Sequence, residues 1–149
     1  MTANSYAPSS TAQHAAGCAP LSKVQVGDVT LHYEMGQGPQ AASRPPLVLL
    51  HGFPLDSRAW AEVAALTESH VLTLRPNLRG FGRLTSTDGF TIDSLADDIY
   101  GLLRQMDLLP CVLAGLSMGG YVALSLVSRY PDAVAGLGLV DTRAGADTS

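Results

Sequence analysis

The chain has 149 residues, of which 46% are hydrophobic and 15% are charged, a composition typical of one folded domain with an apolar core and not of a disordered protein. Thirteen acidic residues against nine basic ones give a net charge of −4, and no cluster of lysine or arginine could neutralise a run of phosphates. The composition therefore argues against a nucleic-acid partner.

The first twenty residues are rich in Ala, Ser and Thr, and they are expected to form a flexible leader (1–20) before a folded part over residues 21–149. The leader has no positively charged start followed by an unbroken apolar stretch, which a secretion signal requires. No run of the sequence approaches the roughly 18 continuous apolar residues that cross a bilayer. We therefore expect a cytoplasmic protein without a membrane partner.

Apolar runs of strand length alternate with runs of helical spacing along the folded part. Two short strands, 23–26 and 29–33, meet at Gly27-Asp28, a pair suited to a tight hairpin turn. The run 47–50 is wholly apolar and follows prolines, which predicts a central strand buried on both faces. The next predicted elements are a helix over 58–67, a strand over 70–74 and a glycine-rich turn over 79–82.

A helix is predicted to begin near Thr91, because apolar residues recur at helical spacing from there to Met106. Its adjacent aspartates, Asp97 and Asp98, are interpreted as helix-surface charges and not as metal ligands. The last predicted elements are a strand over 111–114, a helix over 121–130 and a strand over 134–140. This alternation predicts an α/β fold, with a mostly parallel sheet and helices on both of its faces.

Ser117 lies in the segment 115–120, between the predicted strand 111–114 and the helix after it, which is the strand, tight turn and helix order of a nucleophile elbow. Such a turn raises a serine hydroxyl above the sheet as an attacking group. Gly115 and Gly119 suit it, because a side chain at either position would collide with the strained turn or with the helix packed beneath it. The sequence therefore predicts Ser117 as a catalytic nucleophile.

The segment His51-Gly52-Phe53-Pro54 directly follows the predicted central strand. Acyl transfer builds negative charge on a carbonyl oxygen, so two preorganised backbone N–H groups must point at that oxygen. We expect them to come from Phe53 and from Met118, with Gly52 letting the loop turn inward. His51 has two interpretations, a general base or a residue that fixes the loop through ring hydrogen bonds. Its position before the serine and at a turn favours the second.

Four segments carry these features in a fixed order: 47–54, 75–82, 115–120 and 137–142. Together they resemble the first half of the α/β-hydrolase superfamily, which includes esterases, lipases, lactonases and cofactor-free haloperoxidases. The resemblance implies the α/β-hydrolase fold, truncated after about the sixth strand, and a serine hydrolase activity. Asn77 departs from the family pattern, because relatives usually carry an aspartate there, so that loop is expected to have lost a charge interaction. Leu84 stands where relatives have a small polar residue.

No histidine follows Ser117, although the resemblance implies the chain order serine, acid, histidine. Residues 21–149 are therefore expected to be a partial domain that lacks the cap region, the last strands and the histidine. Asp141 stands where some family members place their acid; the other interpretation is a polar residue that ends a strand. Without a base a serine hydroxyl is a weak nucleophile at neutral pH, so the activity of this chain alone is expected to be feeble.

Two functions remain open from the sequence. The first is a serine hydrolase that acts on an ester, lactone or similar small acyl substrate through an acyl-serine intermediate; a haloperoxidase or an acyltransferase would reuse the same turn. The second is a non-catalytic remnant or interaction module. It would associate with itself, or with a complementing second half, through an uncovered sheet edge near 134–140.

No cofactor is predicted, because the chain has neither a phosphate-binding glycine-rich loop nor a dinucleotide-binding motif after its first strand. The two cysteines lie in unlike settings, with Cys18 in the leader and Cys111 at the start of an apolar strand, where a buried thiol is expected. They predict neither a disulfide framework nor a zinc site.

Overall fold

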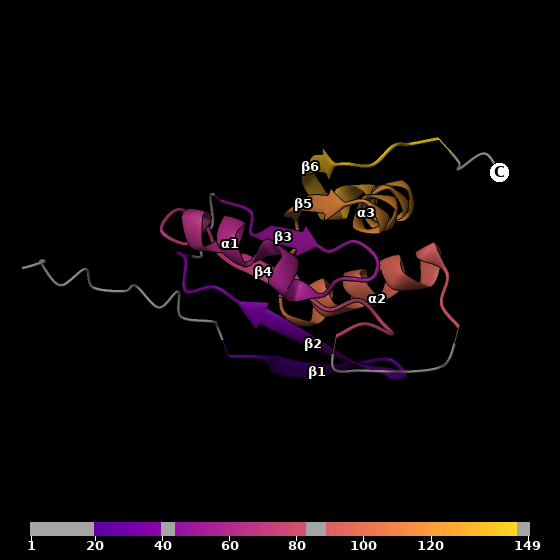
Figure 1. The fold of residues 1–149 in the computed structure, drawn as a ribbon, viewed down its shortest axis with the longest axis horizontal. Coiled ribbons are helices and arrows are strands. Elements are labelled where there is room, and N and C mark those ends of the chain that lie inside the picture. The colour runs from indigo at the N-terminus through magenta and orange to yellow at the C-terminus, as the bar shows by residue number, and fades with distance from the viewer. Residues whose placement is uncertain (1–19, 40–43, 83–88, 146–149) are drawn as a thin grey trace, which may run out of the picture.

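The computed structural model describes residues 20–39, 44–82 and 89–145. Within them one sheet has six strands in the order β1-β2-β4-β3-β5-β6 (Figure 1). The strands are β1 (Ser22–Val26), β2 (Val29–Met35), β3 (Leu47–Leu50), β4 (Thr73–Pro76), β5 (Cys111–Leu116) and β6 (Val134–Val140). The helices are α1 (Ala61–Thr67), α2 (Ile92–Gln105) and α3 (Met118–Arg129), with short 3-10 helices η1 (Ser57–Trp60) and η2 (Pro131–Ala133). Residues 1–19 of the predicted leader, and Leu84, lie outside the described residues.

The sheet is mostly parallel, because β4, β3, β5 and β6 run in one direction. The hairpin of β1 and β2 is antiparallel, and its turn uses Gly27 with a φ of +55°, a conformation that suits glycine. β3 lies between β4 and β5, and Val48, Leu49 and Leu50 are buried. The predicted hairpin, central strand and α/β fold class are confirmed.

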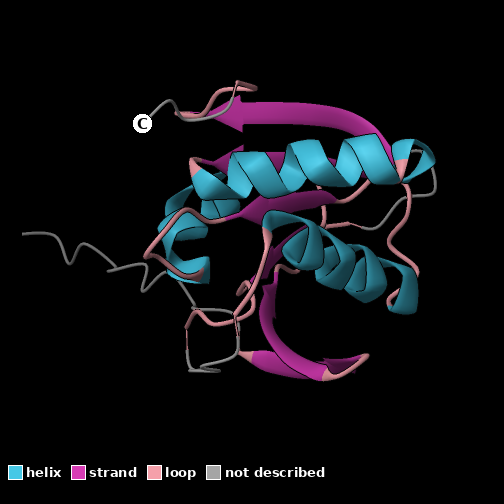
Figure 2. Ribbon diagram, turned by 90° about the vertical axis from the view of Figure 1, so that its right-hand side faces the viewer, coloured by secondary structure: helices cyan, strands magenta, loops and turns pink. Residues whose placement is uncertain are grey.

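Helices cover both faces of the sheet. The residues of β3 show this, because successive side chains of a strand point to opposite faces. Val48 and Leu50 belong to the larger core, which α2 and α3 complete. Leu49 belongs to a smaller core with Trp60 of η1 and Ala64 of α1. Figure 2 shows the two long helices together on one side of the sheet. The predicted covering of both faces is therefore confirmed.

The strand predicted over 70–74 is displaced in the structure to Thr73–Pro76. The sequence pattern ends the strand before Arg75, because a charged residue does not suit a buried strand. In the structure the Arg75 guanidinium is buried and donates to the carboxylate of Glu34 on β2 at 2.9 Å. A charge is tolerated inside a sheet when it is paired in this way, so a tertiary contact moves the boundary.

Two predicted helices begin at other residues. The helix expected over 58–67 begins as the 3-10 helix η1 at Ser57 and is α-helical only from Ala61. The helix expected over 121–130 begins earlier, at Met118. Two glycines follow Met118, and they weigh against a helix in the sequence pattern although both are buried in its first turn.

The interpretation of the two adjacent aspartates of α2, Asp97 and Asp98, as surface charges is wrong for Asp98. Its carboxylate is buried and accepts two hydrogen bonds of 2.8 Å from the guanidinium of Arg79. Arg79 also donates to Asp28 in the hairpin turn, so it ties the segment after β4 both to α2 and to the hairpin. Asp97 is partly exposed, which agrees with its interpretation as a surface charge, and it is paired with Arg129 of α3.

Cys111 is fully buried, as predicted, and burial raises the pKa of its thiol to about 12. Among the described residues, no group of His, Cys, Asp and Glu side chains is arranged to hold a metal ion. None of the described helices is long and apolar enough to cross a membrane.

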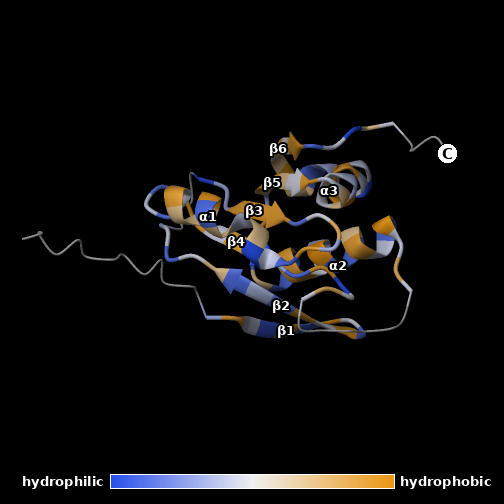
Figure 3. Cartoon of the chain, in the orientation of Figure 1, coloured by the Kyte–Doolittle hydropathy of each residue, from blue (hydrophilic) through white to orange (hydrophobic). Residues whose placement is uncertain are grey.

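β6 forms one edge of the sheet and is only partly covered by the described residues. Leu137, Leu139 and Val140 are 40%, 42% and 43% exposed. Figure 3 shows the strand as an apolar segment at the upper edge of the molecule. The predicted apolar strand is confirmed, and the part of the chain that the structure describes leaves its outer edge and part of its surface uncovered.

Candidate active site

The turn after β5 holds Ser117 in a backbone conformation that most residues avoid. Its φ is +50° and its ψ is −115°, and α3 begins at the next residue. Its N–H donates to the carbonyl oxygen of Val140 at 3.0 Å, and its carbonyl oxygen accepts from the N–H of Gly120 at 2.9 Å. The side chain is exposed and makes no capping hydrogen bond. The hydroxyl is therefore presented to solvent at the carboxyl end of β5.

Two glycines of the Ser117 turn, residues 115–120, bring its backbone segments into contact. A side chain at Gly115 would overlap the backbone of Gly119. A side chain at Gly119 would overlap the carbonyl oxygens of Leu50 and His51. The start of α3 therefore packs directly against the end of β3, and neither position accepts a larger residue.

The His51 loop, residues 51–57, follows β3 and touches the Ser117 turn. A Cβ added to Gly52 would lie 3.0 Å from the carbonyl oxygen of Leu116 and 3.1 Å from the Cβ of Ser117. The N–H of Leu55 donates to the carbonyl of Gly52 at 2.9 Å, which turns the loop back on itself. The two segments that the sequence predicts as one site are thus adjacent in the structure.

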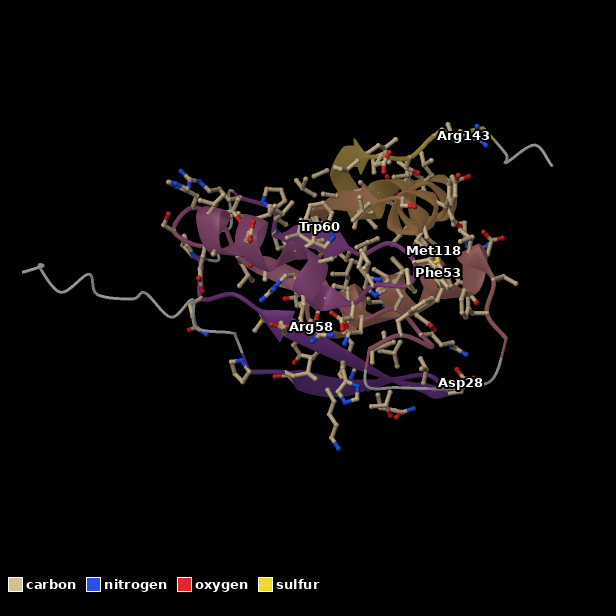
Figure 4. The ribbon with its side chains drawn as sticks, in the orientation of Figure 1. Asp28, Phe53, Arg58, Trp60, Met118 and Arg143 are labelled. Carbon is tan, nitrogen blue, oxygen red and sulfur yellow. The ribbon has the colours of Figure 1, made fainter. Side chains whose placement is uncertain are left out.

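Phe53 and Met118 are the residues whose backbone N–H groups are predicted to bind an oxyanion. Neither N–H donates a hydrogen bond to another described residue. Met118 opens α3, and the first N–H groups of a helix have no partner within it and lie at the positive end of the helix dipole. Figure 4 shows the two residues close together at the ends of β3 and β5. This arrangement can hold a negatively charged oxygen.

The order of strands, the turn after β5 and the adjoining loop are features of one known family. A model of the alpha/beta hydrolase fold matches residues 45–148 of the chain. The chain belongs to the α/β-hydrolase family. The recognition made from the four sequence segments is therefore confirmed.

Relatives within the α/β-hydrolase family carry different names. A fluoroacetate dehalogenase of Burkholderia sp. is 32% identical over 79% of this chain and 39% of that protein. The non-heme chloroperoxidase CPO-A1 of Kitasatospora aureofaciens is 31% identical over 74% of this chain and 39% of its own length. A thermophilic esterase from Thermogutta terrifontis has a TM-score of 0.77 and 35% identity, covering 87% of this chain and 48% of that one. The chain therefore spans less than half the length of these relatives.

His51 of this α/β-hydrolase chain is fully buried, and both of its ring nitrogens are used. Nδ1 donates to the carbonyl oxygen of Gly52 at 3.0 Å, and Nε2 accepts from the N–H of Leu78 at 3.0 Å. The ring packs edge-on against Phe81, with 5.5 Å between centroids. Burial lowers the pKa of the imidazole. A ring held in this way fixes the loop and has no nitrogen left to act as a general base.

The other described histidines lie away from Ser117. His32 is in β2, which β4 and β3 separate from β5, and His70 precedes β4 at the opposite end of the parallel strands. Asp141 directly follows Val140, the residue whose carbonyl oxygen binds the N–H of Ser117, and it is exposed. The described residues thus bring Asp141 close to the turn but supply no histidine with a free ring nitrogen there.

An aromatic cluster that the sequence analysis did not single out borders the His51 loop. Phe81 packs edge-on against Phe53 and in a tilted arrangement against Phe90, with centroid distances of 5.8 and 5.4 Å. The Phe53 side chain is 67% exposed. The sequence feature that could have indicated this cluster is the aromatic residue inside the glycine-rich turn 79–82. These rings give the candidate site an apolar border.

Proposed function

We propose that the Ser117 turn and the His51 loop are the nucleophile elbow and the oxyanion hole of a serine hydrolase that acts on an ester, lactone or similar small acyl substrate. The observation that carries the proposal is the φ of +50° at Ser117, a conformation that costs about 1–3 kcal/mol and presents an exposed hydroxyl. Such strain persists where the surrounding structure enforces it, commonly at functional sites. The esterase among the structural relatives supports this reaction class.

In the proposed reaction the oxygen of Ser117 attacks the carbonyl carbon, and the bond to the leaving alcohol breaks to give an acyl-serine. The N–H groups of Phe53 and Met118 stabilise the charged oxygen, and each such donor contributes about 3 kcal/mol. Water then attacks the acyl-serine, which releases the acid and restores the hydroxyl. A base must accept the serine proton. His51 is engaged by Gly52 and Leu78, so we assign this role to an external histidine, meaning one that the described residues do not include.

A serine nucleophile favours acyl transfer over the reaction named for the dehalogenase relative. If Ser117 displaced a halide from carbon, the product would be an alkyl ether, which water does not cleave under mild conditions. The protein would then stop after one turnover. An acyl-serine is an ester and can be hydrolysed, so the proposed substrate is an acyl compound.

We propose Asp141 as the acid partner of the external histidine. Its position one residue beyond the carbonyl that binds the N–H of Ser117 supports this role. An acid at this point would orient the imidazole and stabilise its charged form. Replacement of Asp141 by asparagine should therefore lower turnover only when the histidine is supplied.

The proposal is tested by labelling the 149-residue chain with an alkyl fluorophosphonate and locating the adduct by mass spectrometry. We expect slow labelling at Ser117, which added imidazole accelerates because it supplies the missing base. Ser117→Ala should abolish the adduct. Ser125→Ala is the matched control, because Ser125 lies on α3 and donates to Asp93 instead of facing the site.

A Ser117 that stays unlabelled, with and without imidazole, would contradict the proposal. Equal loss of labelling in the Ser125→Ala variant would also contradict it, because the reaction would then not depend on the geometry of the turn. Labelling spread over several serines would indicate ordinary surface reactivity.

A second candidate function is that of an interaction module, and the exposure of β6 favours it. The apolar side chains Leu137, Leu139 and Val140 are about two-fifths exposed along an edge that no strand of the described residues pairs with. Unpaired apolar edges associate with other strands. The partner would be a second copy of the chain or a complementing second half of the domain.

A further inference from the structure

We propose that Asn77 is a positioning residue that, with the backbone of Leu78, clamps both ends of the His51 loop and thereby sets the position of the Phe53 N–H. The inference rests on the proposed function, in which that N–H binds the oxyanion. It assigns a role to Asn77, a position that the resemblance marks as a departure from the family pattern.

The two ends of the His51 loop are bonded to two consecutive residues. At the first end, Nε2 of His51 accepts from the N–H of Leu78 at 3.0 Å. At the other end, the N–H of Ser57 donates to Oδ1 of Asn77 at 2.7 Å. His51 and Ser57 are both buried, whereas residues 53–55 between them are exposed. The exposed part of the loop is therefore held by its ends.

The clamping residues are themselves held from several sides. The N–H of Asn77 donates to the carbonyl oxygen of His32 on β2 at 2.8 Å. Leu78 is 1% exposed in the larger core. The Asn77 amide also lies so close to the backbone of Gly82 that a side chain there would overlap it. Asn77 has little freedom to move, so it can serve as a fixed reference for the loop.

A buried ionic pair supports the Ser57 end of the clamp. The hydroxyl of Ser57 donates to the Glu34 carboxylate at 2.6 Å, and that carboxylate also accepts from Arg75 at 2.9 Å. All four residues in this network, including Asn77, are at most 5% exposed. Glu34 and Arg75 balance each other in charge, and an oxygen of residue 77 supplies the remaining acceptor, for the N–H of Ser57.

The clamp affects the candidate site because the His51 loop packs closely against the Ser117 turn. Gly52 lies against the Cβ of Ser117, so a movement of the loop changes the distance between the Phe53 N–H and the reacting oxygen. A displacement of about 1 Å at a catalytic group can lower a rate by about 100-fold. Loss of the acceptor at residue 77 would also leave the buried N–H of Ser57 without a partner.

The test compares Asn77→Leu, which removes the acceptor at similar size, with Asn77→Asp, which keeps it. Asp97→Asn is the matched control, because it removes the charge that pairs with Arg129 between α2 and α3, away from the loop. Two quantities are measured on the full chain. The first is the rate at which fluorophosphonate labels Ser117. The second is the pair of 15N and 1H chemical shifts of the Phe53 amide, recorded before any reaction with fluorophosphonate.

We expect Asn77→Leu to lower the labelling rate about 10- to 100-fold and to shift the Phe53 amide, while Asn77→Asp restores both and Asp97→Asn changes neither. An unchanged Phe53 amide in a folded Asn77→Leu variant would overturn the clamp. So would equal effects of Asn77→Leu and Asn77→Asp. If Asn77→Leu does not fold, Asn77→Asp alone decides: unaltered labelling and shifts support the clamp, and changes as large as those expected for leucine refute it.

The two proposals fail in distinguishable ways. If the unsubstituted chain is not labelled at Ser117, the proposed function fails, whereas the amide shifts still report whether residue 77 controls the loop. If Ser117 is labelled equally fast in the folded leucine variant, the hydrolase proposal stands and the positioning role of Asn77 is refuted.

Discussion

Ser117 carries the clearest conflict between local stability and proposed function. A serine with a φ of +50° is strained, and its hydroxyl forms no capping hydrogen bond that would offset the strain. The surrounding contacts hold it there, through Val140 and the packing of Gly119 on the end of β3. Relief of the strain should therefore stabilise the protein at the expense of reactivity.

We expect Ser117→Gly to raise the free energy of unfolding by about 1 kcal/mol, because glycine tolerates the positive φ and its greater freedom in the unfolded chain offsets only part of the gain. Urea denaturation followed by circular dichroism measures this. Ser125→Gly, in the middle of α3, should have the opposite sign and cost about 0.5–1 kcal/mol. A destabilised Ser117→Gly variant would show that the turn is not strained.

The glycines around Ser117 could be predicted because their pattern is local. Gly115 and Gly119 are four residues apart, and the overlap that each prevents lies within the turn or at the end of β3. The contact of Ser57 with Asn77 could not be predicted, since 20 residues separate the partners and neither residue type specifies the other. Local motifs thus identified the candidate nucleophile, while its supporting contacts required the structure.

At the scale of elements, His51 connects the loop after β3 with the segment after β4. Burial lowers the pKa of its imidazole, although the Gly52 carbonyl and, more weakly, the Asp56 carboxylate act in the opposite direction. Protonation would place a hydrogen on Nε2, the nitrogen that accepts the N–H of Leu78. The connection therefore requires the neutral ring.

The sign of the resulting pH dependence follows from linkage. The unfolded chain, with a histidine pKa near 6.5, binds a proton more readily at His51 than the folded protein does. The contribution of the neutral His51 ring to the free energy of unfolding is therefore fully present above pH 6.5, and it is lost as the pH decreases from there towards the lowered pKa. The carboxyls of Asp28 and Asp56 have pKa values below 3.8, because the Arg79 and Arg58 guanidinium groups bind them, and they titrate outside this range.

We expect the urea midpoint of the unsubstituted chain to decrease between pH 7 and pH 5. In His51→Gln, whose amide oxygen can still accept the N–H of Leu78, this decrease should be reduced because the group no longer titrates. Equal pH slopes in the two proteins would show that the buried imidazole is not the group responsible.

Elements were predictable where their own residues determine burial, as in β3, whose apolar run is buried on both faces. β4 was displaced because Arg75 enters the sheet through its pair with Glu34 of β2, 41 residues away. The surface role expected for Asp98 was wrong for the same reason, since Arg79 is its partner across 19 residues. Long-range ion pairs permit charged residues in buried positions, and no local pattern indicates them.

At the scale of the whole molecule, the two edges of the sheet differ in the kind of strand that forms them. The β1–β2 hairpin forms one edge. β6 forms the other edge and is the outermost of the four parallel strands. Figure 1 shows β6 at the edge farthest from the hairpin. Leu137 and Leu139 remain two-fifths exposed there. An apolar strand with unpaired backbone groups is a surface on which another strand can add.

We expect the chain to associate reversibly through this edge, with a sedimentation coefficient that rises with concentration. Leu139→Lys should shift the equilibrium towards the monomer, because charged side chains, lysine above all, oppose strand addition at an edge. Leu66→Lys is the matched control, since Leu66 is 79% exposed on α1 and away from β6. A monomer at every concentration, or equal effects of the two lysines, would refute association through β6. Because Ser117 bonds to Val140 at the end of this strand, association that depends on Leu139 would also place the partner chain next to the candidate nucleophile.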